Sequence, residues 1–157
     1  MTEQNVVVDM TNESANQHRD CDQILRWAAV LFGVAVALHA ADHLRRGMDV
    51  IPPAVMVTGV IQMVLATVTV VLVVTGSRSA PYAAIAIGFL SAGSFTAAHL
   101  LPPSGFFSDS FINAAPAARV TTFSWISAIL EIGADIVVGL VGIAVLRARN
   151  PRMAHIG

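Results

Sequence analysis

Four long apolar stretches, separated by short polar segments, make up most of this 157-residue chain. They cover residues 24–44, 54–75, 82–101 and 121–146. Each reaches the ~20 residues that a helix needs to cross a hydrocarbon core ~30 Å thick, and a helix satisfies its own backbone hydrogen bonds there. The pattern therefore predicts an all-α polytopic membrane protein, with four transmembrane helices in an up-down bundle.

The segments around these stretches divide the chain into three parts. We expect a polar N-terminal tail over residues 1–23, a transmembrane domain over 24–147 and a short basic C-terminal tail over 148–157. The N-terminal tail lacks the positive start, short apolar run and small-residue cleavage site of a secretory signal peptide. Its polar and acidic residues indicate a loosely ordered segment outside the membrane.

The composition agrees with a membrane protein and limits the possible partners. The chain is 55% hydrophobic and 12% charged, whereas soluble domains are typically about 25% charged. The formal net charge of −1 provides no basic surface for nucleic acid, so we expect no nucleic-acid partner. The lipid bilayer is the expected surrounding, and four short helices also suit a homo-oligomer or a place in a larger membrane complex.

The distribution of arginine predicts the orientation. With four spans, both tails and the second loop lie on one side of the membrane and carry six arginines, against three on the other side. The positive-inside rule then places both termini in the cytoplasm. We therefore expect a multi-pass protein of the cell's inner membrane.

Ionisable residues interrupt three of the four apolar stretches. A charged side chain costs ~2.5–3.5 kcal/mol at the centre of an inserted helix, so such residues mark candidate functional sites. They recur three or four residues apart, which places those of one helix on a common face. These residues are His39, Asp42, His43, His99, Glu131 and Asp135.

Counting the helical rise from the expected membrane boundary gives each residue a depth. At ~1.5 Å per residue, those of the first, third and fourth helices reach similar depths in the outer half of the bundle. The residues expected to meet there are His39, Asp42, His43, His99 and Glu131. Asp135 is expected near the midplane, and Gln62 of the second helix has a compatible depth.

Imidazole and carboxylate groups together are typical ligands of a transition metal such as zinc, copper or iron. His39 and His43 are four residues apart, so their rings can face one ion from a single helix. The predicted metal ligands are therefore His39, Asp42, His43, His99 and Glu131.

The sequence contains neither the zinc-protease motif nor the serine-hydrolase motif. The zinc-protease motif HExxH would need a glutamate where Ala40 stands, and Ser91 lacks the first glycine of GxSxG. These absences favour a metal-binding or accessory membrane protein over an enzyme.

Other interpretations of the same residues stay open at this stage. His39 and His99 could be axial ligands of haem. A proton or ion relay could run from Asp135 near the midplane through Glu131 to His39 and His43, with Gln62 as a possible further member. The chain could also be a non-catalytic structural subunit of a respiratory or transport complex, in which the polar residues serve only to hold the helices in register.

The connection between Pro102 and Pro116 is the longest and is apolar for a loop. Phe106, Phe107 and Phe111 are expected to dip into the membrane interface, where aromatic side chains are enriched. The segment is predicted to be an interfacial anchor or a cap over the polar site.

Overall fold

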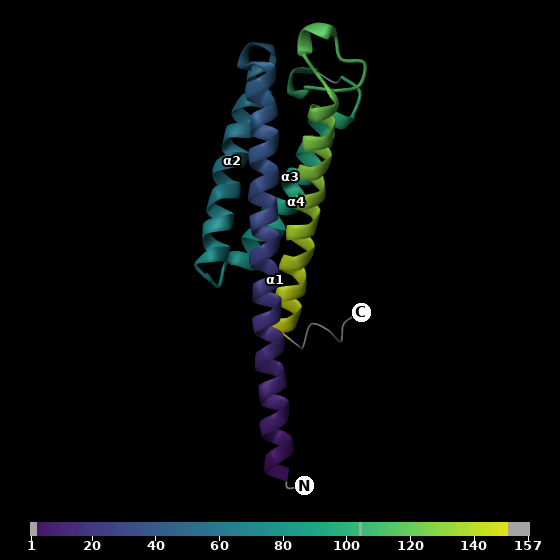
Figure 1. Ribbon diagram of the computed structural model, residues 1–157. Helices are drawn as coiled ribbons and strands as arrows, with labels where there is room; N and C mark the ends of the chain where they lie inside the picture. The colour runs from purple at the N-terminus through teal and green to yellow at the C-terminus, as the bar shows by residue number, and fades with distance from the viewer. Residues whose placement is uncertain (1–2, 104, 151–157) are drawn as a thin grey trace.

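The computed structural model describes residues 3–103 and 105–150, with side chains from Arg19 onward (Figure 1). Over these ranges all regular secondary structure is helical, and the described residues contain no strand. Most of the predicted C-terminal tail, residues 151–157, lies outside the described residues.

Four long helices run alternately up and down (Figure 1). They are α1 (Glu3–Arg46), α2 (Pro53–Val74), α3 (Ala80–Phe95) and α4 (Thr122–Arg149), and α3 continues into a π-helical turn over Thr96–Leu100. Short 3-10 turns cover Met48–Val50, Gly105–Phe107 and Pro116–Ala118. Each long element contains a segment long and apolar enough to cross a membrane. The predicted four-helix membrane bundle is confirmed.

Helix α1 is much longer than the apolar stretch that predicts it. It begins at Glu3, and its N-terminal part projects beyond the other helices (Figure 1). The expectation of a loosely ordered tail is wrong from Glu3 onward. Between Glu3 and Phe32 the sequence has no glycine or proline. Because extending an existing helix is far easier than starting one, the membrane-spanning part can propagate through this polar segment.

Helix α4 is the centre of the packing, because it has the most extensive contacts with α1 and α3, while α2 is more peripheral. Small residues allow the closest approach. A Cβ added to Gly88 of α3 would lie 2.5 Å from the backbone oxygen of Asp135 and 2.9 Å from the backbone nitrogen of Gly139 on α4. Membrane helices associate through such small-residue contacts. Gly88 therefore fixes the position of the α4 face that carries the acidic residues.

The two ends of the bundle differ, and we name them by their connections. The loop end contains residues 47–52 and 101–121, and the tail end contains residues 75–79 with the adjoining ends of the long helices. The apolar core extends from the tail end toward mid-bundle. Its buried residues are Leu25, Ala28, Ala29, Phe32, Val36, Ala66, Val73, Ala80, Ala84, Val138 and Val145.

Large apolar side chains also cover the outside of the bundle. Leu31, Val60 and Leu90 are 62%, 55% and 68% exposed, and many similar residues accompany them on all four helices. A bilayer satisfies these surfaces because its hydrocarbon is as apolar as the side chains. The outward faces therefore suit contact with lipid.

Candidate metal centre

Three histidines from two helices gather inside the loop end. His39 and His43 lie one turn apart on α1, and their ring centroids are 4.6 Å apart. His99, on the π-helical turn, has its ring centroid 4.9 Å from that of His39 and 5.7 Å from that of His43. One nitrogen from each ring can be chosen so that all three lie within 4.8 Å of one another. We call these residues the histidine cluster.

His99 is held by the loop between α3 and α4. Its Nδ1 lies 3.0 Å from the backbone oxygen of Asp109, which can only accept a hydrogen bond. Nδ1 must therefore carry the proton in this contact, and Nε2 keeps its lone pair. The loop is also tied to the π-helical turn through its backbone, since Phe111 N donates to His99 O at 2.9 Å. The ring thus has a defined tautomer and a defined position.

His39 is buried, with only 3% of its surface exposed. Neither of its ring nitrogens has a hydrogen-bond partner within the described part of the chain. Its Nδ1 lies 3.7 Å from Oε2 of Glu131 on α4, which is also without a hydrogen bond there. The ring of Phe95 packs edge-on against it at 4.9 Å. His43 is half-buried, and its Nδ1 lacks a partner by the same criterion.

Glu131 and Asp135 form an acidic face on α4 below the histidine cluster. Both are fully buried. Nε2 of Gln62 lies 3.4 Å from Oε1 of Glu131 and 3.4 Å from Oγ of Ser91, at the long limit for hydrogen bonds. Both carboxylate oxygens of Asp135 are without a hydrogen bond from any described residue. Gln62 therefore joins α2 to this face, and Asp135 lies one helical turn from Glu131.

Asp42 is directed to a different set of partners from the histidines. Its Oδ1 accepts hydrogen bonds from Arg45 at 2.8 and 3.0 Å and from the Ser124 hydroxyl at 3.1 Å. Ser124 also accepts a hydrogen bond from the backbone of Thr121, which caps the start of α4. Asp42 therefore joins the end of α1 to the start of α4, and the compact group of metal-binding atoms does not require it.

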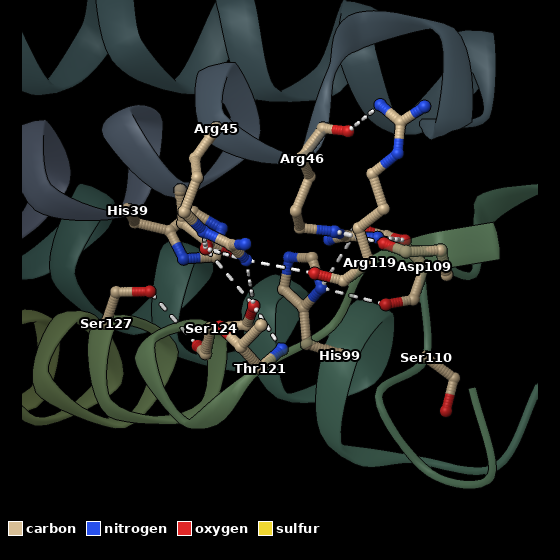
Figure 2. Close-up of polar contacts among 12 residues, drawn as sticks. His39, Arg45, Arg46, His99, Asp109, Ser110, Arg119, Thr121, Ser124 and Ser127 are labelled. Atoms are coloured by element: carbon tan, nitrogen blue, oxygen red, sulfur yellow. Dashed lines mark hydrogen bonds and ion pairs between the residues drawn. The ribbon is translucent and has the colours of Figure 1, made fainter. Parts of the chain in front are cut away.

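A buried ion pair closes the loop end over the histidine cluster (Figure 2). Arg46 is wholly buried, and its Nη1 and Nη2 each donate to one carboxylate oxygen of Asp109 at 2.6 Å. Its Nε donates to Ala118 O at 2.9 Å. A paired, hydrogen-bonded geometry of this kind is what a buried charge requires. The pair therefore secures the loop above His99.

Sequence reasoning missed the contribution of Arg46 and Asp109. Arg46 reads as an ordinary residue at a membrane boundary, and Asp109 is the one acidic residue of the long loop. That isolation in an otherwise apolar loop was the available signal. Phe111 is a correction as well. Instead of dipping into the membrane interface, it is 4% exposed and packs on His99 with a centroid distance of 4.7 Å.

The predicted site residues thus separate into groups. His39, His43 and His99 come together, Glu131 lies beside His39, and Asp42 turns toward Arg45 and Ser124. Three neutral imidazoles within this distance are suitable ligands for zinc, copper or iron. The protein is a membrane-like helical bundle with a His/Asp/Glu cluster that could hold a metal ion. No protein-family model, curated protein or solved structure matches the chain.

Proposed function

We propose that this protein binds a transition metal ion within the membrane, through His39, His43 and His99. The convergence of the three rings at the loop end carries the proposal. Buried polar atoms are normally hydrogen-bonded, and leaving them without partners costs free energy. A metal ion shared by the three imidazoles would satisfy one ring nitrogen of His39, whose two nitrogens have no hydrogen bond from the described residues.

The choice of ligands points to a site that can exchange its ion. Structural zinc sites are usually closed by four protein ligands, whereas three-histidine sites leave a coordination position open. His43 is the least buried of the three. The proposed role is therefore to hold a metal ion or to hand it on as an accessory membrane protein. Zinc, copper and iron all accept nitrogen ligands of this type.

Metal binding by the purified protein tests the proposal. We expect about one zinc or copper ion per chain in detergent, with at least a tenfold loss of affinity in each of His39→Ala, His43→Ala and His99→Ala. His18→Ala is the matched control, because His18 lies 21 residues before His39 on α1, which is ~30 Å along a helix. Unchanged binding by a variant that lacks all three histidines would refute the proposal.

The arrangement gives less support to haem. Axial ligands approach the iron from opposite faces of a flat macrocycle. Here the rings of His39 and His99 contact each other directly, with centroids 4.9 Å apart and planes inclined by 60°. We therefore expect no Soret band that disappears in His99→Ala. Stoichiometric haem in the purified protein would reverse this preference.

A proton or ion relay is the weaker alternative for the acidic face. Glu131 and Asp135 continue the polar path below His39, and Gln62 borders it. Beyond Asp135, however, the buried positions of α4 are Val138, Gly139, Gly142 and Val145. These residues offer no side-chain donor or acceptor. A continuous path would need partner subunits, so we favour metal binding.

The membrane orientation remains our proposal from the arginine distribution. Both termini are expected in the cytoplasm, which places the loop end on the outside. Phe106 is 70% exposed in that loop. In a Cys21→Ser background, Phe106→Cys should react with an impermeant thiol reagent added to intact cells. Reaction only after the cells are opened would invert the orientation.

A further inference from the structure

We propose that Glu131 is a positioning residue of this metal centre, which acts through His39 and does not ligate the ion itself. Its carboxylate would accept the Nδ1 proton of His39, so that Nε2 of the same ring is presented to the metal. The inference rests on the proposed function, because it concerns how the histidine cluster is prepared for an ion.

The contact between the two side chains is the first support. Nδ1 of His39 and Oε2 of Glu131 are 3.7 Å apart, close to but beyond hydrogen-bond distance. Both atoms are buried, and neither has a hydrogen bond to another described residue. A movement of less than 1 Å would satisfy both atoms together. The ring would then have its proton on Nδ1 and its lone pair on Nε2.

The second support is the hydrogen bonding of His99, which has the same arrangement. Its Nδ1 already donates to a backbone oxygen, that of Asp109 at 3.0 Å, which leaves its Nε2 available. Histidine ligands of metals commonly donate their other ring N–H to a carboxylate or carbonyl, which fixes the ring and raises its basicity. Glu131 would accept the Nδ1 proton of His39, as the backbone oxygen of Asp109 accepts that of His99.

The third support is the rigidity of the acceptor. The other oxygen of Glu131 lies 3.4 Å from the amide nitrogen of Gln62 on α2. The helix that carries it is fixed against α3 one turn further along, where Gly88 meets the backbone of Asp135 and Gly139. Glu131 is therefore positioned by two other helices while it faces the ring of His39.

Asp135 offers a matched control for this inference. It lies four residues after Glu131 on the same helix, and both side chains are fully buried. No histidine nitrogen among the described residues lies within 4 Å of the Asp135 carboxyl oxygens, whereas Nδ1 of His39 lies 3.7 Å from Glu131. Replacing either with leucine removes one buried carboxylate from α4 and leaves an apolar residue in a membrane bundle. Loss of a buried carboxyl group is common to the two variants, and loss of the His39 contact is not.

The experiment measures Co²⁺ and Zn²⁺ affinity and the X-ray absorption spectrum of the bound metal in purified full-length protein. We expect Glu131→Leu to lower the affinity by about 10- to 100-fold, the usual effect of removing an outer partner of a ligand. Glu131→Gln keeps a neutral acceptor and should lose less. Asp135→Leu should bind like the parent, and the number of histidine ligands should be the same in all four proteins.

The possible failures are distinct. Equal losses in Glu131→Leu and Asp135→Leu would overturn the positioning role and indicate a general effect of removing a buried carboxyl group from α4. An oxygen ligand that disappears only in the Glu131 variants would make Glu131 a direct ligand and overturn the inference. Parent-like affinity in Glu131→Leu would overturn it while leaving the three-histidine site standing. No metal binding by the parent would instead refute the proposed function. If Glu131→Leu has an altered helical content, Glu131→Gln takes its place in the comparison, because glutamine is closest in shape to glutamate.

Discussion

The helices are held together by different kinds of side chains at the tail end and at the loop end of the bundle. At the tail end the four helices meet through alanine, valine, leucine and phenylalanine, and an ion pair between Asp22 and Arg149 lies on the surface. At the loop end the same helices bury a complete Arg46–Asp109 pair together with the histidine cluster and Glu131.

This difference shows that the architecture does not require the polar groups. Small and apolar residues hold the helices together at the tail end without a buried charge among the core residues described there. Burying charges at the loop end adds a desolvation cost that well-packed apolar residues would avoid. A purely structural explanation would not account for that cost, which supports the proposed binding role of the loop end.

Breaking the buried ion pair should give the largest effect. Arg46→Met leaves Asp109 as an uncompensated buried carboxylate, so we expect the free energy of unfolding to fall by about 3–5 kcal/mol. Arg149→Met is the control, because Arg149 and its partner Asp22 have side chains that are 34% and 47% exposed. Such an exposed pair contributes about 0–1 kcal/mol. Denaturant unfolding in detergent measures both.

Equal stability of the two arginine variants would contradict the comparison. It would mean that the loop end is held by its apolar contacts, as the tail end is. Metal affinity of Arg46→Met should also fall, because its loss frees the loop that holds His99.

Helix packing should be the next most sensitive feature. Gly88→Ala places a methyl group against the backbone of α4, and overpacking of this kind costs about 1–3 kcal/mol. Gly93→Ala, on the same helix, is the control because no atom of the described chain lies within 4 Å of its added Cβ. It should be neutral or stabilising, since alanine is the better helix former by about 1 kcal/mol. A Gly93→Ala protein as unstable as Gly88→Ala would show that the α3–α4 crossing is looser than described.

The contact between the histidine cluster and α4 should appear as coupling. We expect His39→Leu and Glu131→Leu to deviate from additivity by about 0.5–2 kcal/mol in unfolding stability, because they are in contact. The coupling should increase in the presence of zinc, which stabilises the native state that binds it. Strict additivity with and without zinc would mean that the two side chains do not act together.

The smallest effect should come from the surface of the tail end. Asp22→Asn removes a pair whose side chains are 47% and 34% exposed, and we expect a change of about 0–1 kcal/mol that diminishes further in high salt. The same unfolding assay measures it. A cost as large as that of Arg46→Met would remove the contrast between the two ends.

The sequence predicted the fold well because hydrophobic length and proline placement determine the spans. The four-residue spacing of His39 and His43 predicted that both rings lie on one face of the helix. The depth of Glu131 on the fourth span predicted that it lies near them. Asp42 shows the limit of such reasoning. It shares a helix face with His39, yet Arg45 and Ser124 compete for its carboxylate, and spacing does not rank partners of that kind.

The loop residues were beyond prediction for a different reason. Asp109 and Phe111 reach His99 through backbone hydrogen bonds of an irregular segment, and no periodicity describes such a segment. Arg46 was equally hidden, since its burial depends on the loop folding back over the end of α1. The pattern of polar residues predicts which face of each helix is buried. The contacts that cover the histidine cluster depend instead on the conformation of the loop between helices, which that pattern does not predict.

The π-helical turn at Thr96–Leu100 ends α3 and carries His99. π-Helical turns are rare and are frequent at functional sites. We expect deletion of either Ala97 or Ala98 to rotate the position of His99 about the helix axis by about 100°. The four spans, their lengths and the apolar tail end would be retained. Loss of a single codon would then leave two converging imidazoles in place of three, and the proposed site would be lost without a change in the fold.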